Sequence, residues 1–326
     1  MTEPPFHVEV LTKLDADETD AVALLSERAT EHDGVRPLSE HVTLHLRHGG
    51  DEGVRHLLIY GDGRGPLPHL AGYAHLDVTD EVAGSSAEVV VDPSWRRQGV
   101  GSRLVSAVRA ETPDGRLRLW AHGESPAASG LAAGLGFSKT RELLQLRRSL
   151  SAPIPPTEVP DGVSVRPFVP GHDDEAWVAL NALIFADHPE QGTLSLDDLH
   201  RRIAEPWFDA SGFFLAERGG QLVGYHWTKV HGGEAFVHEH DGHGPHTHDQ
   251  HGHDPIGEVY VVGVHPAERG SGLGTALIVL GLRHLRSAGL LEAMLYVDAD
   301  NTAAIAAYKR LGFTHWDSDV QFRSPD

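Results

Sequence analysis

The chain has 326 residues, and at about 150 residues per domain that length predicts two domains. Hydrophobic residues make up 40% and charged residues 23%, a balance typical of core-forming proteins that excludes wholesale disorder. The 27 Lys and Arg against 47 Asp and Glu give a formal net charge of −20, which argues against binding to nucleic acid or anionic membranes.

The chain contains no cysteine, which excludes disulfides, iron–sulfur clusters, thiolate zinc sites and a cysteine nucleophile. Residues 1–6 have neither the basic region nor the apolar core of a signal peptide. The longest apolar stretches, such as 276–280, are far too short to cross a bilayer. We therefore expect a cytoplasmic protein without a membrane partner, and a monomer.

The first half mixes strand and helix patterns. An apolar strand at 8–10 is followed by an acidic turn and a helical pattern. Residues 89–104 (VVVDPSWRRQGVGSRL) predict a strand, an X-Pro step, an Arg-X-X-Gly-X-Gly loop and an amphipathic helix. Gly-Leu-Gly-Phe follows at 134–137. Residues 151–160 then hold four prolines, which disfavour helix and central strand and predict a stiff linker.

The second half repeats this order. It opens on a strand at 163–165, carries VGVHPAERGSGLGTAL at 262–277, and ends its repeat with Arg-Leu-Gly-Phe at 310–313. The two loops lie 173 positions apart and the two Leu-Gly-Phe motifs 176 apart. Two motifs at nearly one offset predict two tandem domains of the α/β (α+β) class, 1–152 and 163–326, joined by a linker at 153–162.

A strand, a glycine-rich turn and a helix together form an anion cradle. Main-chain N–H groups at a helix start have no internal partner, and glycine lets the backbone approach a phosphate closely. Arg96 and Arg269 can add charge-assisted hydrogen bonds. Neither loop is a P-loop, because no Lys-Ser/Thr follows the glycines. Neither contains Gly-X-Gly-X-X-Gly, the dinucleotide-binding fingerprint. A single copy would be read as a tight turn, whereas two copies favour a ligand-binding role.

The Val-X-Pro-X-X-Arg-X-X-Gly-X-Gly motif, followed by NTAAIAAYKRLGF at 301–313, resembles the GNAT superfamily of acetyl-CoA-dependent N-acetyltransferases. With 224–231, 258–264 and 295–301, the tandem arrangement is similar to the mycothiol synthase (mycothiol acetyltransferase) family, most densely from 181 to 316. The resemblance implies two tandem GNAT domains, each a mixed central sheet flanked by helices. It also implies transfer of acetyl from acetyl-CoA to the cysteinyl amine of cysteinyl-glucosaminyl-inositol (desacetylmycothiol), which gives mycothiol.

Acetyl transfer to an amine needs a base for the ammonium, donors for the oxyanion and a proton for the thiolate. Glu258, six residues before Val264, is the candidate base, although by position alone it suits a solvent-facing strand glutamate. Tyr308 is the candidate acid, since helical spacing puts it on one face with Asn301, although it also suits a half-buried core tyrosine.

The resemblance implies that both halves bind acetyl-CoA, and nothing in acetyl transfer requires a metal. The main chain at 262–264 would polarise the acetyl carbonyl. The predicted cofactor-binding residues of the second half are Val262, Gly263, Val264, Arg269, Gly270, Ser271, Gly272, Leu273, Gly274, Thr275, Asn301, Thr302, Ala303, Ala304, Ile305 and Ala306. Those of the first half are Val89, Val90, Val91, Arg96, Arg97, Gln98, Gly99, Val100 and Gly101.

The substrate-binding residues follow from the resemblance alone. They are Glu40, Glu190, Lys229, Glu258 and Tyr296. Carboxylates, a lysine and a phenol suit a polyhydroxylated ligand that carries one ammonium group. Glu40 is nearly as well explained as a plain surface or helix-start glutamate.

The first half lacks the candidate catalytic residues. The offset of 173 places a serine where the second half has Glu258, and the offset of 176 replaces the asparagine, the candidate acid and Tyr296. These counterparts are Ser85, Ser125, Ala132 and Trp120. The first half is therefore expected to bind CoA without catalysing the reaction.

A histidine-rich insert at 231–255 holds eight histidines among Gly, Asp and Pro, which predicts a flexible loop. Imidazoles suit zinc, nickel or copper, so adventitious metal binding is one interpretation and a tolerated, solvated insertion is the other. Two alternatives to the leading function remain open: a tandem GNAT enzyme acting on another small-molecule amine or a peptide N-terminus, and a non-catalytic CoA- or metal-binding protein.

Overall fold

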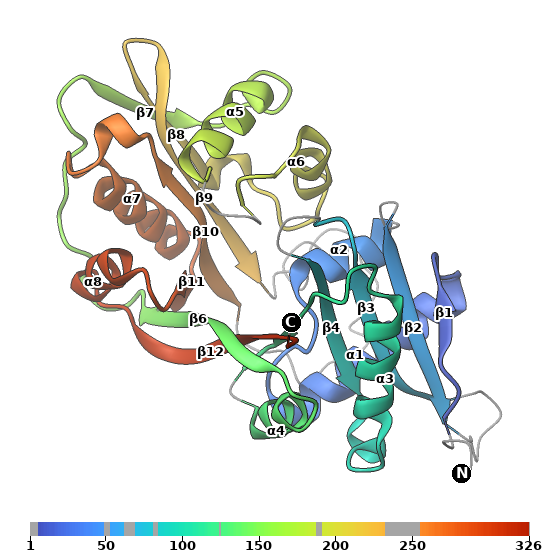
Figure 1. Ribbon diagram of the computed structural model, residues 1–326. Coiled ribbons are helices and arrows are strands. Elements are labelled where there is room, and N and C mark those ends of the chain that lie inside the picture. Colours follow the sequence, from blue (N-terminus) through green and yellow to red (C-terminus); the bar gives the residue numbers. More distant parts are fainter. Residues whose placement is uncertain are drawn as a thin grey trace, which may run out of the picture. The chain divides into compact units, whose positions relative to one another are not determined.

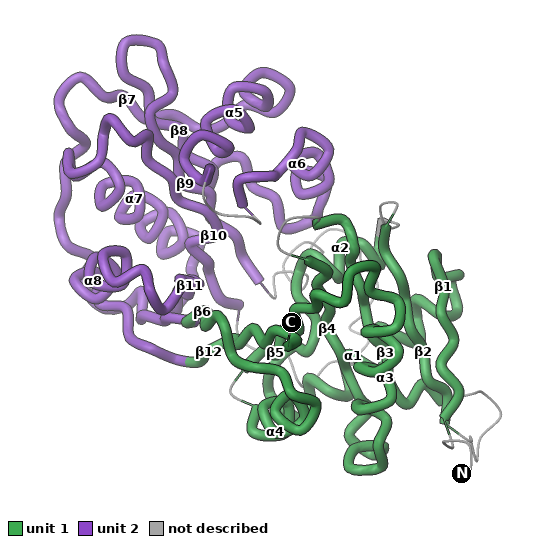
Figure 2. The backbone as a smooth tube through the Cα atoms, viewed as in Figure 1, with its two compact units in different colours: residues 1–144, 317–326 green, residues 145–316 purple. Residues whose placement is uncertain are grey.

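The strands and helices of this computed structural model form two units, each of which contains a mixed sheet and helices (Figures 1 and 2). One unit comprises residues 1–144 and 317–326, and the other comprises residues 145–316. The structure describes the following residues: 6–48, 53–61, 69–80, 84–123, 125–186, 191–231 and 255–325.

The first unit has the strand order β1-β2-β3-β4-β5-β12-β6. Strands β1 to β4 pair antiparallel, and β4 pairs parallel with β5. Its elements are β1 (Glu9–Leu11), α1 (Ala16–Asp33), α2 (Glu40–His48), β2 (Val54–Gly61), β3 (His69–Asp77), β4 (Ser85–Val91), α3 (Val100–Glu111), β5 (Leu117–Ala121), α4 (Pro126–Gly134), most of β6 (Ser138–Ser149) and most of β12 (Thr314–Arg323).

Helices cover both faces of this sheet because its strands are apolar on both sides. Along β2, Leu57 and Ile59 pack with α3 and α4, whereas Leu58 between them packs with α1 and α2. This alternation follows from the two-residue period of a strand. Helix α1 begins at a capping box, in which Asp15 and Glu18 satisfy each other's main-chain N–H groups.

The second unit has the strand order β6-β11-β10-β9-β8-β7, with β8 antiparallel to β7 and β9, and β10 parallel to β11. Its elements are the end of β6, β7 (Val163–Pro167), α5 (Asp174–Ile184), α6 (Leu196–Ile203), β8 (Phe213–Arg218), β9 (Gln221–His231), β10 (Ile256–Val264), α7 (Leu273–Ser287), β11 (Glu292–Asp298), α8 (Thr302–Arg310) and the start of β12.

An aromatic core holds β8 and β9 beneath α5 and α6. Phe213 stacks on Trp227 with ring centroids 4.4 Å apart, and Trp177 meets Trp227 edge-on at 5.8 Å. All three side chains are fully buried. On the other face, Leu273 and Leu277 of α7 pack against Ala216. Such burial stabilises the sheet by about 1.5–3 kcal/mol for each large side chain, so β9 gives the site described below a rigid floor.

The chain changes unit inside β6 and inside β12. The last strand, β12, pairs antiparallel with β5 of the first unit, with Val320 opposite Ala121. In the second unit, the N–H of Leu150, just after β6, bonds to the carbonyl of Leu291 at 2.8 Å. Residues 153–160 of the proline-rich stretch are neither helix nor strand. The division into units therefore differs from the predicted boundary at 153–162, because β12 from the end of the chain completes the first sheet.

A buried ionic cluster fixes β12 in the first unit. His122 lies 3.4 Å from Glu88 and 3.1 Å from Asp319, and Asp319 also accepts the N–H of Gly123 at 2.9 Å. Burial opposes the imidazolium charge, but the Glu88 and Asp319 carboxylates outweigh it and raise the pKa of His122 to about 10. The imidazolium therefore bridges two carboxylates from β4 and β12.

Replacing His122 with Gln should lower the free energy of unfolding by about 3 kcal/mol, because a buried carboxylate loses its counter-charge. The folded-state pKa lies above the ordinary value of 6.5, so this stabilisation is fully present below pH 6.5 and is lost as the pH rises toward 10. Denaturant titrations between pH 6 and 10 should show a fall in stability that is smaller in the variant. An unchanged pH slope would contradict the assignment.

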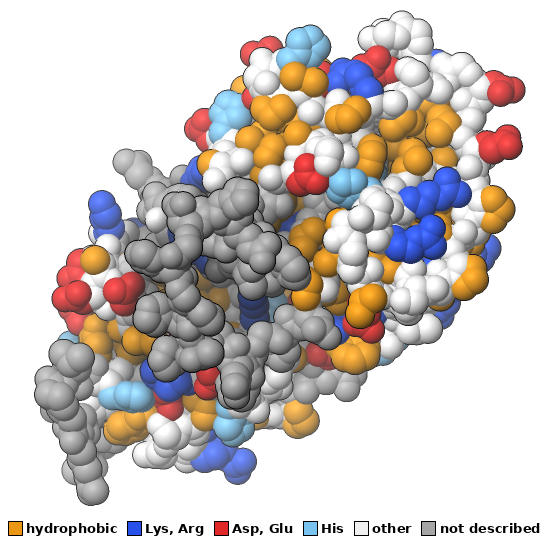
Figure 3. All heavy atoms as spheres, turned by 180° about the vertical axis from the view of Figure 1, so that it is seen from behind, with side chains coloured by type: hydrophobic (Ala, Val, Ile, Leu, Met, Phe, Trp, Pro, Cys, Tyr) orange, Lys and Arg blue, Asp and Glu red, His pale blue; other side chains and the backbone are white. Residues whose placement is uncertain are grey.

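On the face shown in Figure 3, acidic, basic and histidine side chains lie in small groups among hydrophobic ones, with no continuous basic surface. Within the described part of the chain, no helix combines the length and hydrophobicity that a bilayer crossing requires.

Candidate active site

The second sheet opens between β10 and β11. These strands pair only at Gly257–Ala293 and Glu258–Met294, and the described residues form no later pair. Strand β10 runs on to Val264 while still pairing with β9. Alternate main-chain groups of residues 262–264 therefore face the opening instead of a neighbouring strand, which leaves them able to bind a ligand.

A β-bulge lies directly between Glu258 and this free edge. The register of β10 against β9 shifts between Val259 and Val261, which makes Tyr260 the extra residue. Tyr260 packs edge-on against Trp227 at 5.3 Å, and its hydroxyl accepts a hydrogen bond from Arg202 of α6 at 2.8 Å. A bulge increases strand twist and redirects side chains, so it helps to aim the residues that flank the opening.

The bulge also corrects the predicted counterpart of Glu258. In the first unit, β3 and β4 pair without a shift, with Val91 opposite Gly72, just as Val264 lies opposite Gly224. Counting back through one extra residue brings Glu258 to Ser86, not to Ser85. The parallel pairs agree, because Gly257–Ala293 corresponds to Ser85–Leu117. The first unit still has a serine where the second has the carboxylate.

The loop after β10 has the geometry of an anion cradle. Gly272 caps the start of α7 with φ +90°, and Gly270 has φ +82°, a region that favours glycine. The first N–H groups of α7 lack intrahelical partners. Arg269 is exposed, and no side-chain partner for it is found in the described part of the chain. Leu273 is fully buried in the core, so only its main chain can contribute to the cradle.

The first loop has the same backbone but a different charge balance. Gly99 caps α3 with φ +90°, and Arg97 takes the place of Gly270 with φ +63°, an uncommon conformation for a side-chain-bearing residue. Arg96 forms a two-point ion pair with Asp33 at 2.7 and 2.6 Å, and its Nε donates to the carbonyl of Val91. Arg96 is therefore already engaged, and it holds the pKa of Asp33 below its usual range.

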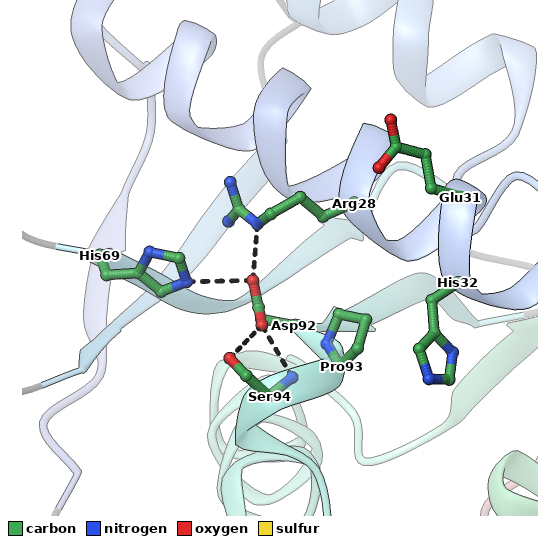
Figure 4. Close-up of a pocket in the computed structure, with 7 residues that line it drawn as sticks. All are labelled: Arg28, Glu31, His32, His69, Asp92, Pro93 and Ser94. Carbon is green, nitrogen blue, oxygen red and sulfur yellow. Dashed lines mark hydrogen bonds and ion pairs between the residues drawn. The ribbon is translucent and has the colours of Figure 1, made fainter. Parts of the chain in front are cut away.

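Asp92, which precedes the loop proline of the first unit, is also held by neighbouring residues. Arg28, His69 and Ser94 converge on Asp92 in a pocket of about 420 Å³ (Figure 4). Burial opposes the charge on Asp92, but hydrogen bonds from Ser94 and Arg28 hold its pKa at about 2. Asp92 therefore remains an anion beside the first loop at neutral pH.

Glu258 and His231 form the central polar pair of the second unit. The two side chains are 9% and 24% exposed, and Nε2 of His231 lies 2.7 Å from Oε2 of Glu258. The solvent-facing alternative for Glu258 therefore does not hold. His231 was not singled out in the sequence, where it is only the first histidine of the insert.

Lys229 lies on the same face in an aromatic frame. It is the direct cross-strand partner of Glu258 and is only 6% exposed. Its Nζ lies 4.4 Å from the ring centroid of Trp207 and 5.3 Å from that of Tyr260. Aromatic faces favour a desolvated cation. The sequence analysis identified Lys229 but missed both aromatic residues, since a lone aromatic gives no functional signal.

Tyr308 faces the core side of α8, where it meets Phe313 edge-on at 5.8 Å. Burial raises the pKa of its phenol to about 12, so the hydroxyl stays protonated at neutral pH. No hydrogen-bond partner for this hydroxyl is found in the described part of the chain. Asn301 has a structural task, because its Oδ1 caps α8 by accepting the N–H of Ala304 at 3.1 Å.

The remaining predicted substrate residues belong to different elements of the chain. Glu40 begins α2 in the first unit, and Tyr296 of β11 is 39% exposed, with its hydroxyl 2.7 Å from Nε2 of Gln145. Glu190 lies outside the described residues, as does residue range 232–254 of the insert. In the part of the chain that is described, no group of three or more His, Asp or Glu side chains is arranged to hold a metal.

Both halves match known acetyltransferases. Residues 177–313 match the acetyltransferase (GNAT) family model, and residues 54–139 match the acetyltransferase (GNAT) domain model. The mycothiol acetyltransferase of Acidothermus cellulolyticus is 57% identical over 301 residues, which cover 92% of this chain and 89% of that protein. That of Streptosporangium roseum is 52% identical over 97% of this chain and 98% of its own length.

The chain belongs to the mycothiol acetyltransferase family. It is an N-acetyltransferase with two GNAT domains, which confirms the predicted fold class and enzyme class. A solved tandem GNAT protein from the clavulanic acid biosynthesis pathway has the same fold, with a TM-score of 0.68 and 17% identity over 98% of this chain and 100% of its own. GNAT acetyltransferases use acetyl-CoA, and membership of this family implies small-molecule substrates.

Within this mycothiol acetyltransferase family member, the CoA sites predicted at the two loops can be compared directly. Asp33→Asn should release Arg96 for a phosphate and remove a nearby negative charge. An exposed ion pair is worth about 1 kcal/mol or less, so CoA should bind the first unit more tightly by at most about fivefold. Calorimetric titration with CoA reports on both predicted sites. Gly272→Val strains a left-handed position and should weaken binding at the second loop, which identifies the signal that comes from that loop.

The matched control for this comparison is Arg96→Gln. Alone it should weaken CoA binding only slightly, because Arg96 is already paired with Asp33. Combined with Asp33→Asn, it should cancel the gain. Weaker CoA binding by Asp33→Asn alone would show that the ion pair organises the loop instead of competing with the ligand.

Proposed function

We propose that this chain transfers the acetyl group of acetyl-CoA to the cysteinyl amine of cysteinyl-glucosaminyl-inositol (desacetylmycothiol), which gives mycothiol. The observation that carries the proposal is the identity of 48–57% to proteins named mycothiol acetyltransferase over most of the chain. The buried Glu258 and the protonated Tyr308 of the second unit supply the two proton-transfer groups that such a reaction needs.

Glu258 is the proposed base. Its carboxylate takes one proton from the substrate ammonium, directly or through a water, and the free amine then attacks the thioester carbonyl. Since Glu258 lies two residues before the bulge and six before Val264, the base and the free main-chain edge belong to one strand. N–H groups of residues 262–264 would stabilise the oxyanion, as preorganised donors do in other acyl transfers.

Tyr308 is the proposed acid. When the tetrahedral intermediate collapses, the carbon–sulfur bond breaks and the phenol gives its proton to the CoA sulfur. The phenolate of Tyr308 regains a proton as the nitrogen loses its second one, so the net reaction releases one proton, which passes from Glu258 to solvent. A phenol with a pKa of about 12 is fully protonated at neutral pH, so the proton is present when the thiolate leaves.

The second loop, with its exposed Arg269, is the proposed site for the reacting acetyl-CoA, together with the start of α8 around Asn301. The first loop is proposed to bind CoA without catalysis, because Ser86 and Ala132 stand where the second unit has Glu258 and Tyr308. We further propose no metal requirement and a cytoplasmic monomer, in keeping with a cysteine-free chain.

Substrate recognition is proposed to use Lys229, Tyr296, Glu40 and Glu190 in addition to Glu258. The aromatic frame holds Lys229 as a fixed cation, and such a group can donate hydrogen bonds to sugar or inositol hydroxyls. The carboxylates and the phenol would accept hydrogen bonds from the same hydroxyls. The proposal assigns the ammonium itself to Glu258.

Mass spectrometry of the product tests this function. Purified protein is incubated with acetyl-CoA and cysteinyl-glucosaminyl-inositol, and the substrate mass should rise by one acetyl group, located on the cysteinyl nitrogen by fragmentation. Parallel reactions contain glucosaminyl-inositol without cysteine, an aminoglycoside and a peptide with a free N-terminus. Acetylation of one of these in preference to the cysteinyl substrate would replace the proposed acceptor.

A further inference from the structure

The most distinctive contact around the proposed base comes from a residue that the proposed reaction does not yet use. His231 is the last residue of β9, and its main chain pairs with Ile256 at the start of β10. It therefore lies two residues beyond Lys229, the direct partner of Glu258, on the same face of the sheet. Diagonal neighbours of this kind are within reach of each other's long side chains.

We propose that His231 is a positioning residue for Glu258: its Nε2–H donates to Oε2 at 2.7 Å and leaves the other carboxylate oxygen for the substrate ammonium. This inference rests on the proposed function and adds a residue to its base. A carboxylate anion can only accept, so the imidazole nitrogen must be the donor. The contact fixes one rotamer of Glu258.

The surroundings indicate that this role belongs to His231. Met294, the β11 partner of Glu258, has no donor, and the ammonium of Lys229 is held over Trp207 and Tyr260. Arg202 of α6 donates to the Tyr260 hydroxyl. Among the described residues, these contacts place the titratable or charged groups Lys229, His231, Tyr260 and Arg202 around Glu258, and His231 forms a hydrogen bond to it.

Two substitutions separate the donor from the bulk of the side chain. His231→Leu keeps a similar volume and removes the donor, whereas His231→Gln retains an N–H donor at a comparable distance from the main chain. His172→Leu is the matched control, because His172 is an exposed histidine of the same unit that pairs with Asp173. Circular dichroism and the melting temperature establish that each variant is folded.

The readout is the split between kcat and KM, together with rescue by the variant that keeps the donor. In His231→Leu, kcat should fall about tenfold because the carboxylate is no longer oriented, with little change in the KM for acetyl-CoA. His231→Gln should recover most of the lost kcat.

A double-mutant comparison completes the test. In a Glu258→Gln background, His231→Leu should cause little further loss, since the two residues act as one unit. The inference is overturned if His231→Leu leaves kcat unchanged, or if the Leu and Gln variants behave alike. Full activity of Glu258→Gln would instead remove the proposed base itself, so the two failures are distinguishable.

Discussion

Replacing Glu258 with Gln is expected to lower kcat/KM by at least about a hundredfold, because general-base catalysis contributes roughly 10²–10⁴-fold. The amide has nearly the same shape and still offers an oxygen to His231, but it cannot take a proton from the ammonium. The residue is only 7% exposed, so water cannot easily replace the lost base. Steady-state rates of CoA release with the cysteinyl substrate measure the effect.

Two controls separate a lost base from a damaged site. Glu292→Gln makes the same chemical change on a carboxylate of β11 whose side chain is 52% exposed, and it should leave the rate unchanged. CoA affinity of Glu258→Gln, measured by calorimetry, should stay within about twofold, since the loop after β10 is untouched. A variant that turns over at the wild-type rate at pH 7 would mean that another group, or water alone, accepts the proton.

The sequence alone predicted those parts of the fold and site that depend on local pattern. Both loops begin their helices on a left-handed glycine, Gly99 and Gly272. At the offset of 176, Ser125 and Asn301 both cap a helix through their side chains. Capping and turn geometry are written in a few neighbouring residues, so a repeated motif carries them reliably from one half to the other.

Features that depend on pairing between distant residues could not be predicted. The bulge at Tyr260 leaves no mark in the sequence, and it moved the counterpart of Glu258 from Ser85 to Ser86. Strand β12 pairs with β5 although the two strands lie some 200 residues apart in the sequence. Trp207, which frames Lys229, is far from it along the chain and matches no motif.

The first unit shows why a buried carboxylate is not by itself a base. Glu88 of β4 is only 7% exposed, yet by strand register it corresponds to Val261 and not to Glu258. It accepts the N–H of Ser39 at 2.6 Å and faces His122 at 3.4 Å. Those partners hold the carboxylate for structure, whereas the partner found for Glu258 among the described residues is the imidazole of His231.

Replacing Tyr308 with Phe is expected to reduce kcat by about tenfold to a hundredfold, since the CoA thiolate would leave without a proton from the enzyme. The protein should remain as stable as wild type. The Tyr308 hydroxyl has no hydrogen-bond partner in the described part of the chain, so its removal breaks no internal contact, while the edge-on packing against Phe313 is retained. Rates, acetyl-CoA KM and the melting temperature are measured together.

The pattern of these three quantities identifies the role of the phenol. A general acid predicts lower kcat with an unchanged melting temperature and an acetyl-CoA KM within about threefold of wild type. Tyr60→Phe, the same change at a half-buried tyrosine of the first unit, should alter none of them. A lower melting temperature with normal kcat in Tyr308→Phe would show that Tyr308 has a structural role in the core and is not the acid. The acid would then be another group around the opening between β10 and β11.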